Sequence, residues 1–297
     1  FSSIFLASSF SCSQALSTSA HPPLTQTVEP LGVIVMNIDY KHRDHFRRIA
    51  PLYRSLRMTD TQPIIYISRQ LKSLPTIKAA DIGCGAGRYT KLLVQSLRDK
   101  MSFIYGIDYS AKMLGQLNRY FAKDGIPVTG TVKASAMCLP LRDESFNCLF
   151  TFNAIHHFAL LEFLRETARI LNDDGYLFIY TRLRSQNSRS IWGRFFPLFI
   201  AKETRLYEAD ELKDAIIKIP NLRLQKTRIF KFNRKSNLES IREQAMNRHY
   251  STLDLYTQSE FEVALTQFQS NLLDYFDDPH DIQWVDENIL LVLQKAG

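Results

Sequence analysis

The segment 79–90, with the sequence AADIGCGAGRYT, constrains the fold of this chain more than any other. An apolar run ends in an acid, Asp81, and a glycine-rich turn leads from it into a helical pattern. Glycines suit such a turn because the backbone must bend sharply and approach a ligand closely, where a Cβ atom would intrude. The amino end of the helix offers N–H groups and a partial positive charge to a carboxylate or phosphate. The segment therefore predicts a strand–turn–helix unit that binds a charged small molecule.

Strands and helices alternate on both sides of this segment. We expect strands at 77–82, 102–108, 127–134, 146–152 and 175–181, and helices at 87–97, 111–122 and 160–171. After residue 181 we expect a Trp- and Phe-rich loop (SIWGRFFPLF), a helix at 209–217, a strand at 222–232, helices at 238–246 and 258–276, and a last strand at 282–294. This alternation predicts an α/β fold of the Rossmann-like kind. It has a seven-stranded, mostly parallel sheet with helices on both faces, an N-terminal helical cap and a helical insertion before the last strand.

The first 35 residues differ from the rest of the chain. They contain neither Lys nor Arg, and Glu29 is their one acid. We expect 1–35 to be a disordered leader, not necessarily part of the native protein, because a secretory signal would need a basic head and a transit peptide would need Arg. The folded domain is then 36–297, divided into N-terminal helices (36–76), a cofactor-binding core (77–181) and substrate-side additions with the last two strands (182–297).

The composition of the chain limits where in the cell we expect it to be. No apolar run approaches the roughly 20 residues that span a bilayer. The four cysteines form no CxxC pair and show no metal-ligand spacing, which favours a reducing compartment. We expect a cytoplasmic protein, or an organellar one if 1–35 is a truncated targeting leader, and no bound metal. The sequence does not predict an oligomeric state.

The glycine pattern distinguishes two classes of ligand. The dinucleotide fingerprint is G-x-G-x-x-G, but the sixth position counted from Gly83 is Arg88, and the pattern here is acid-x-G-x-G-x-G. Asp81 would repel a pyrophosphate and would favour the cationic groups of S-adenosylmethionine. Asp108 ends the second strand 21 residues after Gly87 (108 − 87), where an acid can accept hydrogen bonds from both ribose hydroxyls.

These motifs resemble the class I S-adenosylmethionine-dependent methyltransferases, particularly the branch around the ubiquinone/menaquinone biosynthesis methyltransferases (methyltransferase type 11). The resemblance spans about 78–181 and includes ASAMCLPL (134–141), SFNCLFTFNAIHHF (145–158) and ARILNDDGYL (168–177). Ser135 and Asn147 stand where the family usually has Asp. The resemblance implies that S-adenosylmethionine is bound, and S-adenosylhomocysteine released, by Asp81, Gly83, Cys84, Gly85, Gly87, Arg88, Asp108, Tyr109, Met113, Ser135, Ala136 and Asn153. Tyr109 and Met113 are expected to pack on the adenine ring.

Methyl transfer is an in-line displacement, and it needs a general base only if the acceptor must lose a proton. His156 and His157 follow the fourth strand at the edge where open α/β sheets bind ligands, so they are our candidate catalytic residues. Each could instead be a packed or backbone-bonded histidine. Tyr40, Phe46, Tyr53, Trp192 and Phe195 are candidate walls of the acceptor pocket.

The acceptor is less constrained than the cofactor. The chain has a net charge of +7, and basic residues gather at 41–57, 182–194 and 223–235, which suits an anionic partner. We favour a small-molecule acceptor. The alternative is a transfer RNA, because LPLRDESFN and NAIHHF also resemble the wobble-uridine carboxymethyl methyltransferases. A non-catalytic cofactor-binding partner of another methyltransferase is a third possibility. We further expect the insertion at 238–276 and the basic helix at 41–57 to close over the cofactor cleft.

Overall fold

The computed structural model describes Ala50, residues 57–124 and residues 130–297. The predicted leader (1–35), the residues Tyr40, Phe46 and Tyr53, and nearly all of the predicted helix at 41–57 lie outside the described residues. The start of the strand predicted at 127–134 does so too.

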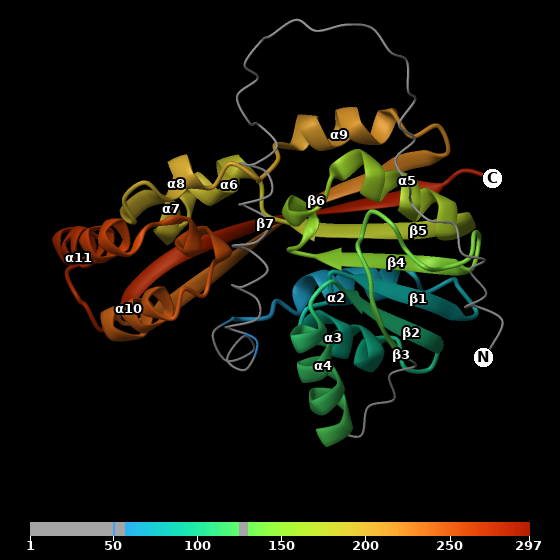
Figure 1. Cartoon of the computed structure of the whole chain (residues 1–297), viewed down its shortest axis with the longest axis horizontal. Helices are drawn as coiled ribbons and strands as arrows, with labels where there is room; N and C mark the ends of the chain where they lie inside the picture. Colours follow the sequence, from blue (N-terminus) through green and yellow to red (C-terminus); the bar gives the residue numbers. More distant parts are fainter. Residues whose placement is uncertain (1–49, 51–56, 125–129) are drawn as a thin grey trace, which may run out of the picture.

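The strands of the described residues form one seven-stranded sheet in the order β3-β2-β1-β4-β5-β7-β6 (Figure 1). Their bounds are β1 Ile77–Ile82, β2 Met101–Asp108, β3 Gly130–Lys133, β4 Phe146–Phe152, β5 Leu171–Thr181, β6 Leu222–Ser236 and β7 Ile282–Lys295. The first five strands run parallel, and β7 pairs antiparallel with both β5 and β6. The predicted α/β, Rossmann-like, mostly parallel sheet is confirmed.

Helices cover both faces of this sheet because each presents an apolar stripe at helical spacing. On one face lie α2 (Gln62–Gln70), α3 (Arg88–Ser96) and α4 (Ala111–Lys123), and on the other α5 (Leu160–Ile170) and α9 (Ala209–Ile217). Helix α4, for example, buries Met113, Leu114, Leu117 and Phe121. Two apolar cores result, and together they hold the carboxyl ends of β1, β2, β4 and β5 at one edge of the sheet. Among the described residues, none of the helices has the length and apolar character that crossing a membrane requires.

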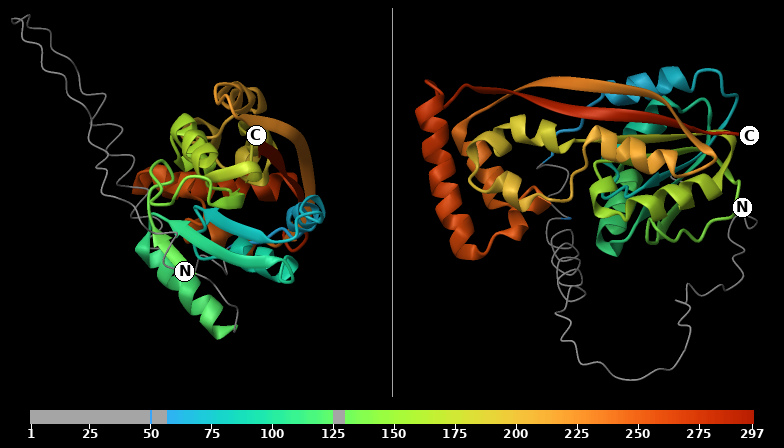
Figure 2. Two further views of the ribbon diagram at one scale, coloured as in Figure 1. Left: turned by 90° about the vertical axis from the view of Figure 1, so that its right-hand side faces the viewer. Right: turned by 90° about the horizontal axis from the view of Figure 1, so that it is seen from above.

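Strands β6 and β7 extend past that edge. β7 pairs with β5 only from Ile289 to Gln294, whereas its first half pairs with β6 alone, ending with Ser236 opposite Ile282. The right-hand view of Figure 2 shows the two strands running out from the sheet together. We call this two-stranded extension, residues 230–236 and 282–288, the β6–β7 arm.

Short helices pack against the arm and form what we call the helical module. It comprises α6 (Arg184–Arg189), α7 (Ile191–Phe195), α8 (Phe199–Lys202), α10 (Leu238–Met246), the 3-10 helix η3 (Ser251–Leu255) and α11 (Gln258–Tyr275). Its core contains Trp192, Phe196, Phe199, Phe261 and Phe268. The module lies beyond the carboxyl ends of the parallel strands (Figure 1).

The prediction of a loop for SIWGRFFPLF was wrong, because these residues form α7 and α8. Ser190 caps α7, since its hydroxyl accepts a hydrogen bond from the N–H of Gly193 at 3.1 Å. Trp192 and Phe199 are then buried in the core of the module. Burial of these rings stabilises helices that are too short to persist alone.

Candidate functional site

The glycine turn after β1 has the backbone that the sequence predicts. Gly83, Gly85 and Gly87 have φ angles of +73°, +54° and +80°, the left-handed region that favours glycine. Space is a second constraint, because a Cβ atom on Gly83 would lie 2.6 Å from the Cβ of Ala154. The N–H groups of Gly83 and Cys84 both donate to the carbonyl of Ile107, which holds the turn against the end of β2. The turn is thus wedged between the ends of β2 and β4.

Asp81 is a buried carboxyl group at the end of β1. Its Oδ2 accepts a hydrogen bond of 2.5 Å from the hydroxyl of Thr90, and its Oδ1 is buried with no hydrogen-bond partner among the described residues. Burial, assisted by the nearby charge of Asp108 and opposed by the Thr90 hydrogen bond, raises the pKa of Asp81 to about 7. The site therefore holds a carboxyl group that lacks a cationic partner.

Asp108 lies beside the turn at the end of β2. Its Oδ2 accepts from the N–H of Gly85, and its Oδ1 from the N–H of Ser110, both at 2.8 Å. Burial raises the pKa of Asp108, and the two N–H donors act in the opposite direction. A carboxylate can accept about four hydrogen bonds, so two positions remain for a ligand with paired hydroxyls.

The other candidate cofactor residues near the glycine turn differ in how far they are buried. Cys84 is half-buried, and its thiol donates to the carbonyl of Gly85 at 3.7 Å. Tyr109 is 48% exposed, whereas Met113 is buried against Ala86 and Ala50. Met113 therefore packs beneath the turn in this structure and does not present an open surface to an adenine ring.

Three further candidates are Arg88, Ser135 and Ala136. Arg88 begins α3, and its guanidinium donates to the carbonyl of Met58 at 2.7 Å and to the hydroxyl of Thr59 at 3.0 Å. It therefore holds the segment before α2. Ser135 and Ala136 follow β3, and the Ser135 hydroxyl accepts from the N–H of Met137 at 3.3 Å. The role of each of these residues toward a cofactor stays a prediction.

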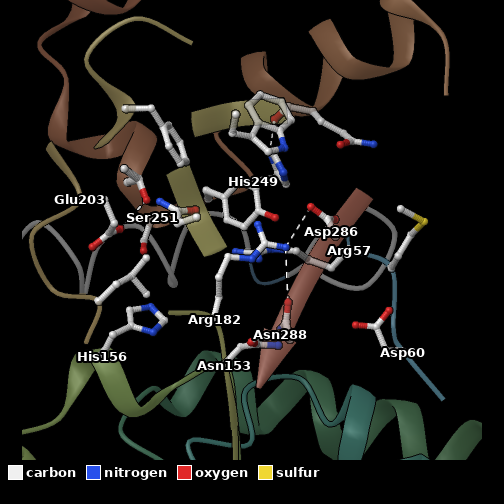
Figure 3. Close-up of a pocket in the computed structure, with 18 of the residues that line it drawn as sticks. Arg57, Asp60, Asn153, His156, Arg182, Glu203, His249, Ser251, Asp286 and Asn288 are labelled. Atoms are coloured by element: carbon white, nitrogen blue, oxygen red, sulfur yellow. Dashed lines mark hydrogen bonds and ion pairs between the residues drawn. The ribbon is translucent and has the colours of Figure 1, made fainter. Parts of the chain in front are cut away.

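A second site, of a different character, lies on the other side of the end of β4. A cavity of about 130 Å³, which we call the polar cavity, opens between the carboxyl edge of the sheet, the β6–β7 arm and the helical module (Figure 3). Its walls include Asp60, Asn153, His156, His157, Arg182, Trp192, Glu203, Arg234, His249, Tyr250, Trp284, Asp286 and Asn288.

Arg182 directly follows β5, and its side chain extends into the middle of this cavity (Figure 3). Its Nη2 lies 3.1 Å from Asp286 Oδ1, an ion pair without the alignment of a hydrogen bond, and 3.5 Å from Asn288 Oδ1. The Asn288 amide in turn donates to Asn153 Oδ1 at 3.1 Å. Burial acts to lower the pKa of Arg182, but the charges of Asp286, Tyr250, Tyr180 and Asp60 together outweigh it and the pKa is raised. The guanidinium is therefore a buried, permanent positive charge.

A second ion pair continues the network along the arm. Arg234 donates from Nε to Asp286 Oδ2 at 3.3 Å and from Nη2 to Asp60 Oδ1 at 2.5 Å. The other oxygen of Asp60 accepts from the hydroxyl of Tyr180 at 2.8 Å. These bonds join the ends of β5, β6 and β7 to the segment before α2, so the shape of the cavity depends on all four.

The two candidate catalytic histidines line the polar cavity. His156 and His157 form the end of the short 3-10 helix η2 (Ile155–His157), directly after β4, and their ring centroids are 4.1 Å apart. Both are half-buried. Trp192, one of the two aromatic residues expected in this wall within the described residues, also lines the cavity, whereas Phe195 packs on Tyr275 and Phe276 instead. A catalytic role for the histidines stays a prediction.

Sequence reasoning identified Asn153 but missed the acids of the cavity and the amide of Asn288. Arg182 and Arg234 had been noted only as members of basic clusters, and Asp60, Asp286 and Asn288 had not been singled out. A signal existed in VDENI, where Asp286 and Asn288 alternate just before the apolar run at 289–293. Alternate residues of a strand share one face, so two buried polar side chains on that face predict a polar site.

Residues 80–179, which include the glycine turn, Asp108 and the end of β4, match the family described as the methyltransferase domain. This chain carries a methyltransferase domain. The match coincides with the S-adenosylmethionine-dependent, class I motifs, so the resemblance drawn from the sequence is confirmed.

Similar proteins agree on the domain and differ in the acceptors that their names give. The chain is 31% identical over 119 residues to the probable tRNA methyltransferase 9B of mouse (Mus musculus), which covers 39% of this chain and 24% of that protein. It is 30% identical over 118 residues to the phthiotriol/phenolphthiotriol dimycocerosates methyltransferase 1 of Mycobacterium ulcerans, covering 39% and 41%. The matches span about a quarter of the length of the tRNA methyltransferase 9B relatives.

Among solved structures, the YcgJ protein of Bacillus subtilis superposes on the methyltransferase domain with a TM-score of 0.60 at 17% identity. The superposition covers 80% of this chain and all of YcgJ. At that identity the likeness shows the fold, and it extends beyond the segment that carries the family's motifs.

Proposed function

We propose that this chain transfers a methyl group from S-adenosylmethionine to a small-molecule acceptor bound in the polar cavity. The observation that carries the proposal is that the glycine turn and the cavity meet at the end of β4. Gly83 packs on Ala154, while the neighbouring residue Asn153 lines the cavity. A donor bound at the turn and an acceptor bound in the cavity would face each other across these residues.

The residues at the turn fit S-adenosylmethionine. The buried Oδ1 of Asp81 has no partner, and the cofactor's ammonium group would supply the missing cation. Asp108 keeps acceptor capacity for two ribose hydroxyls. The bound cofactor would supply a methyl group already activated by its sulfonium. The protein's part is to hold the acceptor in line with that methyl group and to exclude water.

The cavity supplies groups for the acceptor's side of the reaction. Asn153 is held with a φ of +52°, and its N–H donates to the carbonyl of Tyr180 at 2.7 Å, so its side chain is fixed at the boundary between the two sites. His156 and His157 lie next to it and would accept a proton from an acceptor that must lose one. The helical module covers this part of the edge, which restricts water around the reacting atoms.

Transfer RNA methylation is the alternative, and two observations favour it. The mouse relative is named a probable tRNA methyltransferase. In addition, β6 is an edge strand whose exposed side chains include Arg223, Lys226, Arg228 and Lys231, a row that would attract a phosphate backbone. We favour the small molecule because the site next to the turn is a narrow cavity with walls from the module and the arm.

Transfer from methyl-labelled S-adenosylmethionine tests the proposal. The full chain would be incubated separately with a small-molecule extract and with purified transfer RNA, and with Asp108→Ala protein as the control for cofactor-dependent labelling. Label in low-molecular-mass products from the wild-type protein alone supports the proposal. Label in transfer RNA alone would favour the alternative, and no label above the control in either fraction would contradict methyl transfer to both classes.

A further inference from the structure

The polar cavity has more hydrogen-bond donors than acceptors. Every carboxylate oxygen in its walls already faces a donor of the protein. The two oxygens of Asp60 meet Arg234 and Tyr180, and those of Asp286 meet Arg182 and Arg234. Asp286 Oδ1 makes no hydrogen bond among the described residues, but it lies 3.1 Å from the cationic Arg182 Nη2, which neutralises its charge.

The third acid, Glu203, is satisfied in the same way. Its Oε1 accepts from Arg205 Nε at 2.8 Å, and its Oε2 contacts Arg205 Nη2 and accepts from the Thr252 hydroxyl at 2.5 Å. Burial acts to raise the pKa of Glu203, but these bonds and the nearby positive charge outweigh it and the pKa is lowered. The lowered pKa means that Glu203 is ionised and paired. Glu203 therefore does not balance the positive charge elsewhere in the cavity.

Two donors in the cavity walls have no acceptor. Arg182 Nη1 and Trp284 Nε1 are both buried, and neither makes a hydrogen bond within the part of the chain that the structure describes. Leaving such a donor unpaired destabilises the folded protein, and more strongly when the donor carries a charge. Two unsatisfied buried donors in one cavity are rare in native structures, where a ligand or an ordered water usually accepts such hydrogen bonds.

The charges of the cavity walls, like the unpaired donors, favour an anionic ligand. The described residues that line the cavity include four arginines, Arg57, Arg88, Arg182 and Arg234, against the acids Asp60, Glu203 and Asp286. Since Glu203 is paired with Arg205 behind the wall, the cavity has an excess of positive charge. A cationic acceptor would be repelled, and an anion would be attracted.

We propose that the acceptor is a small carboxylic acid whose carboxylate binds the Arg182 guanidinium, with the Trp284 indole N–H donating to a further oxygen of the same molecule. This inference rests on the proposed function and names its substrate class. A single carboxylate fits because Arg182 already gives Nη2 to the protein and keeps one nitrogen for a ligand. The aromatic side chains of Trp192, Phe199 and Tyr250 in the same walls would contact the acid's apolar part.

Tryptophan fluorescence offers a direct test, because the chain has two tryptophans, and both Trp192 and Trp284 line the cavity. Protein loaded with S-adenosylhomocysteine would be titrated with benzoate, with its uncharged analogue benzamide and with phenyl phosphate. We expect benzoate to bind at least about tenfold more tightly than benzamide, as a charge-assisted hydrogen bond to a buried arginine implies. Phenyl phosphate should bind more weakly than benzoate.

Two variants tie this binding to Arg182. Arg182→Met should lose benzoate binding. Asn288→Asp keeps the size of the side chain and places a carboxylate beside the guanidinium, so it should also lose binding while the protein stays folded. Arg242→Met is the matched control, since Arg242 pairs with Glu239 on the surface of α10 and does not line the cavity. It should bind benzoate like the wild type.

The outcomes separate this inference from the proposed function. Calorimetry on the same samples reports S-adenosylhomocysteine binding. If that ligand fails to bind, the proposed function fails; if it binds and benzoate does not, only the carboxylate inference fails. Equal affinity for benzoate and benzamide, tighter binding of phenyl phosphate, or unchanged benzoate binding by Asn288→Asp would each overturn the carboxylate assignment.

Discussion

Replacing Asp81 with Asn should make the stability of the ligand-free protein less dependent on pH. In the wild type, burial raises the pKa of Asp81 from 3.8 to about 7. Between these two values the folded state holds a proton that the unfolded state has released. The stabilisation from that proton is therefore fully present below pH 3.8 and is lost as the pH rises through about 7.

The size of the effect follows from the two pKa values. With one pKa unit equal to about 1.4 kcal/mol, Asp81 should cost the wild type about 2–3 kcal/mol of unfolding free energy between about pH 5 and pH 8. Asn cannot ionise, so Asp81→Asn lacks this loss. Its amide oxygen can still accept from Thr90, and its buried N–H₂ group adds a cost that does not depend on pH.

Urea unfolding of both proteins at several pH values measures the difference. The free-energy difference between Asp81→Asn and the wild type should move in favour of the variant by about 2–3 kcal/mol from about pH 5 to pH 8, whatever its sign at the start. Contributions from titrating groups that do not interact with Asp81 cancel in this comparison. Parallel pH profiles of the two proteins would refute the account of Asp81 as a buried carboxyl group without a cationic partner.

Three further expectations follow from the turn and the module. Asp108→Ala should weaken S-adenosylhomocysteine binding by about ten- to a hundredfold in calorimetry while the circular dichroism spectrum stays unchanged, and an unaltered affinity would mean that the ribose contact is misassigned. Gly83→Ala should lower the unfolding free energy by about 2 kcal/mol or more, because its φ is +73° and the new Cβ would lie 2.6 Å from that of Ala154; wild-type stability in urea would contradict this. Hydrogen exchange should slow in 41–57 and 238–276 when S-adenosylhomocysteine binds, whereas protection limited to the glycine turn would leave no support for a closing lid.

Local patterns predicted the glycine turn and the strand ends beside it well. The turn at Gly83–Gly87 and the acid at Asp108 are encoded within short segments, where glycine conformations and strand ends are dictated by neighbouring residues. The sheet could be predicted for the same reason, since each strand and helix has its own apolar period. Strand β7 illustrates this, because its apolar run at 289–293 required a buried position between two other strands.

The polar cavity could not be predicted in this way. The polar cavity depends on Asp60, Arg182, Arg234 and Asp286, which are far apart in the sequence and meet only because the β6–β7 arm extends past the sheet edge. No local period encodes that extension. The helices predicted at 238–246 and 258–276 are present as α10 and α11, whereas the short helices α6, α7 and α8 were not predicted. The reason is related, because α7 depends on tertiary burial of Trp192 more than on its own propensity.

Calorimetric titration of the full chain with S-adenosylhomocysteine and with NADH tests the central claim most directly. The account predicts saturable, one-to-one binding of S-adenosylhomocysteine and no binding of NADH, because Asp81 stands beside the turn where a pyrophosphate would have to lie. Tight binding of NADH without any signal from S-adenosylhomocysteine would contradict it.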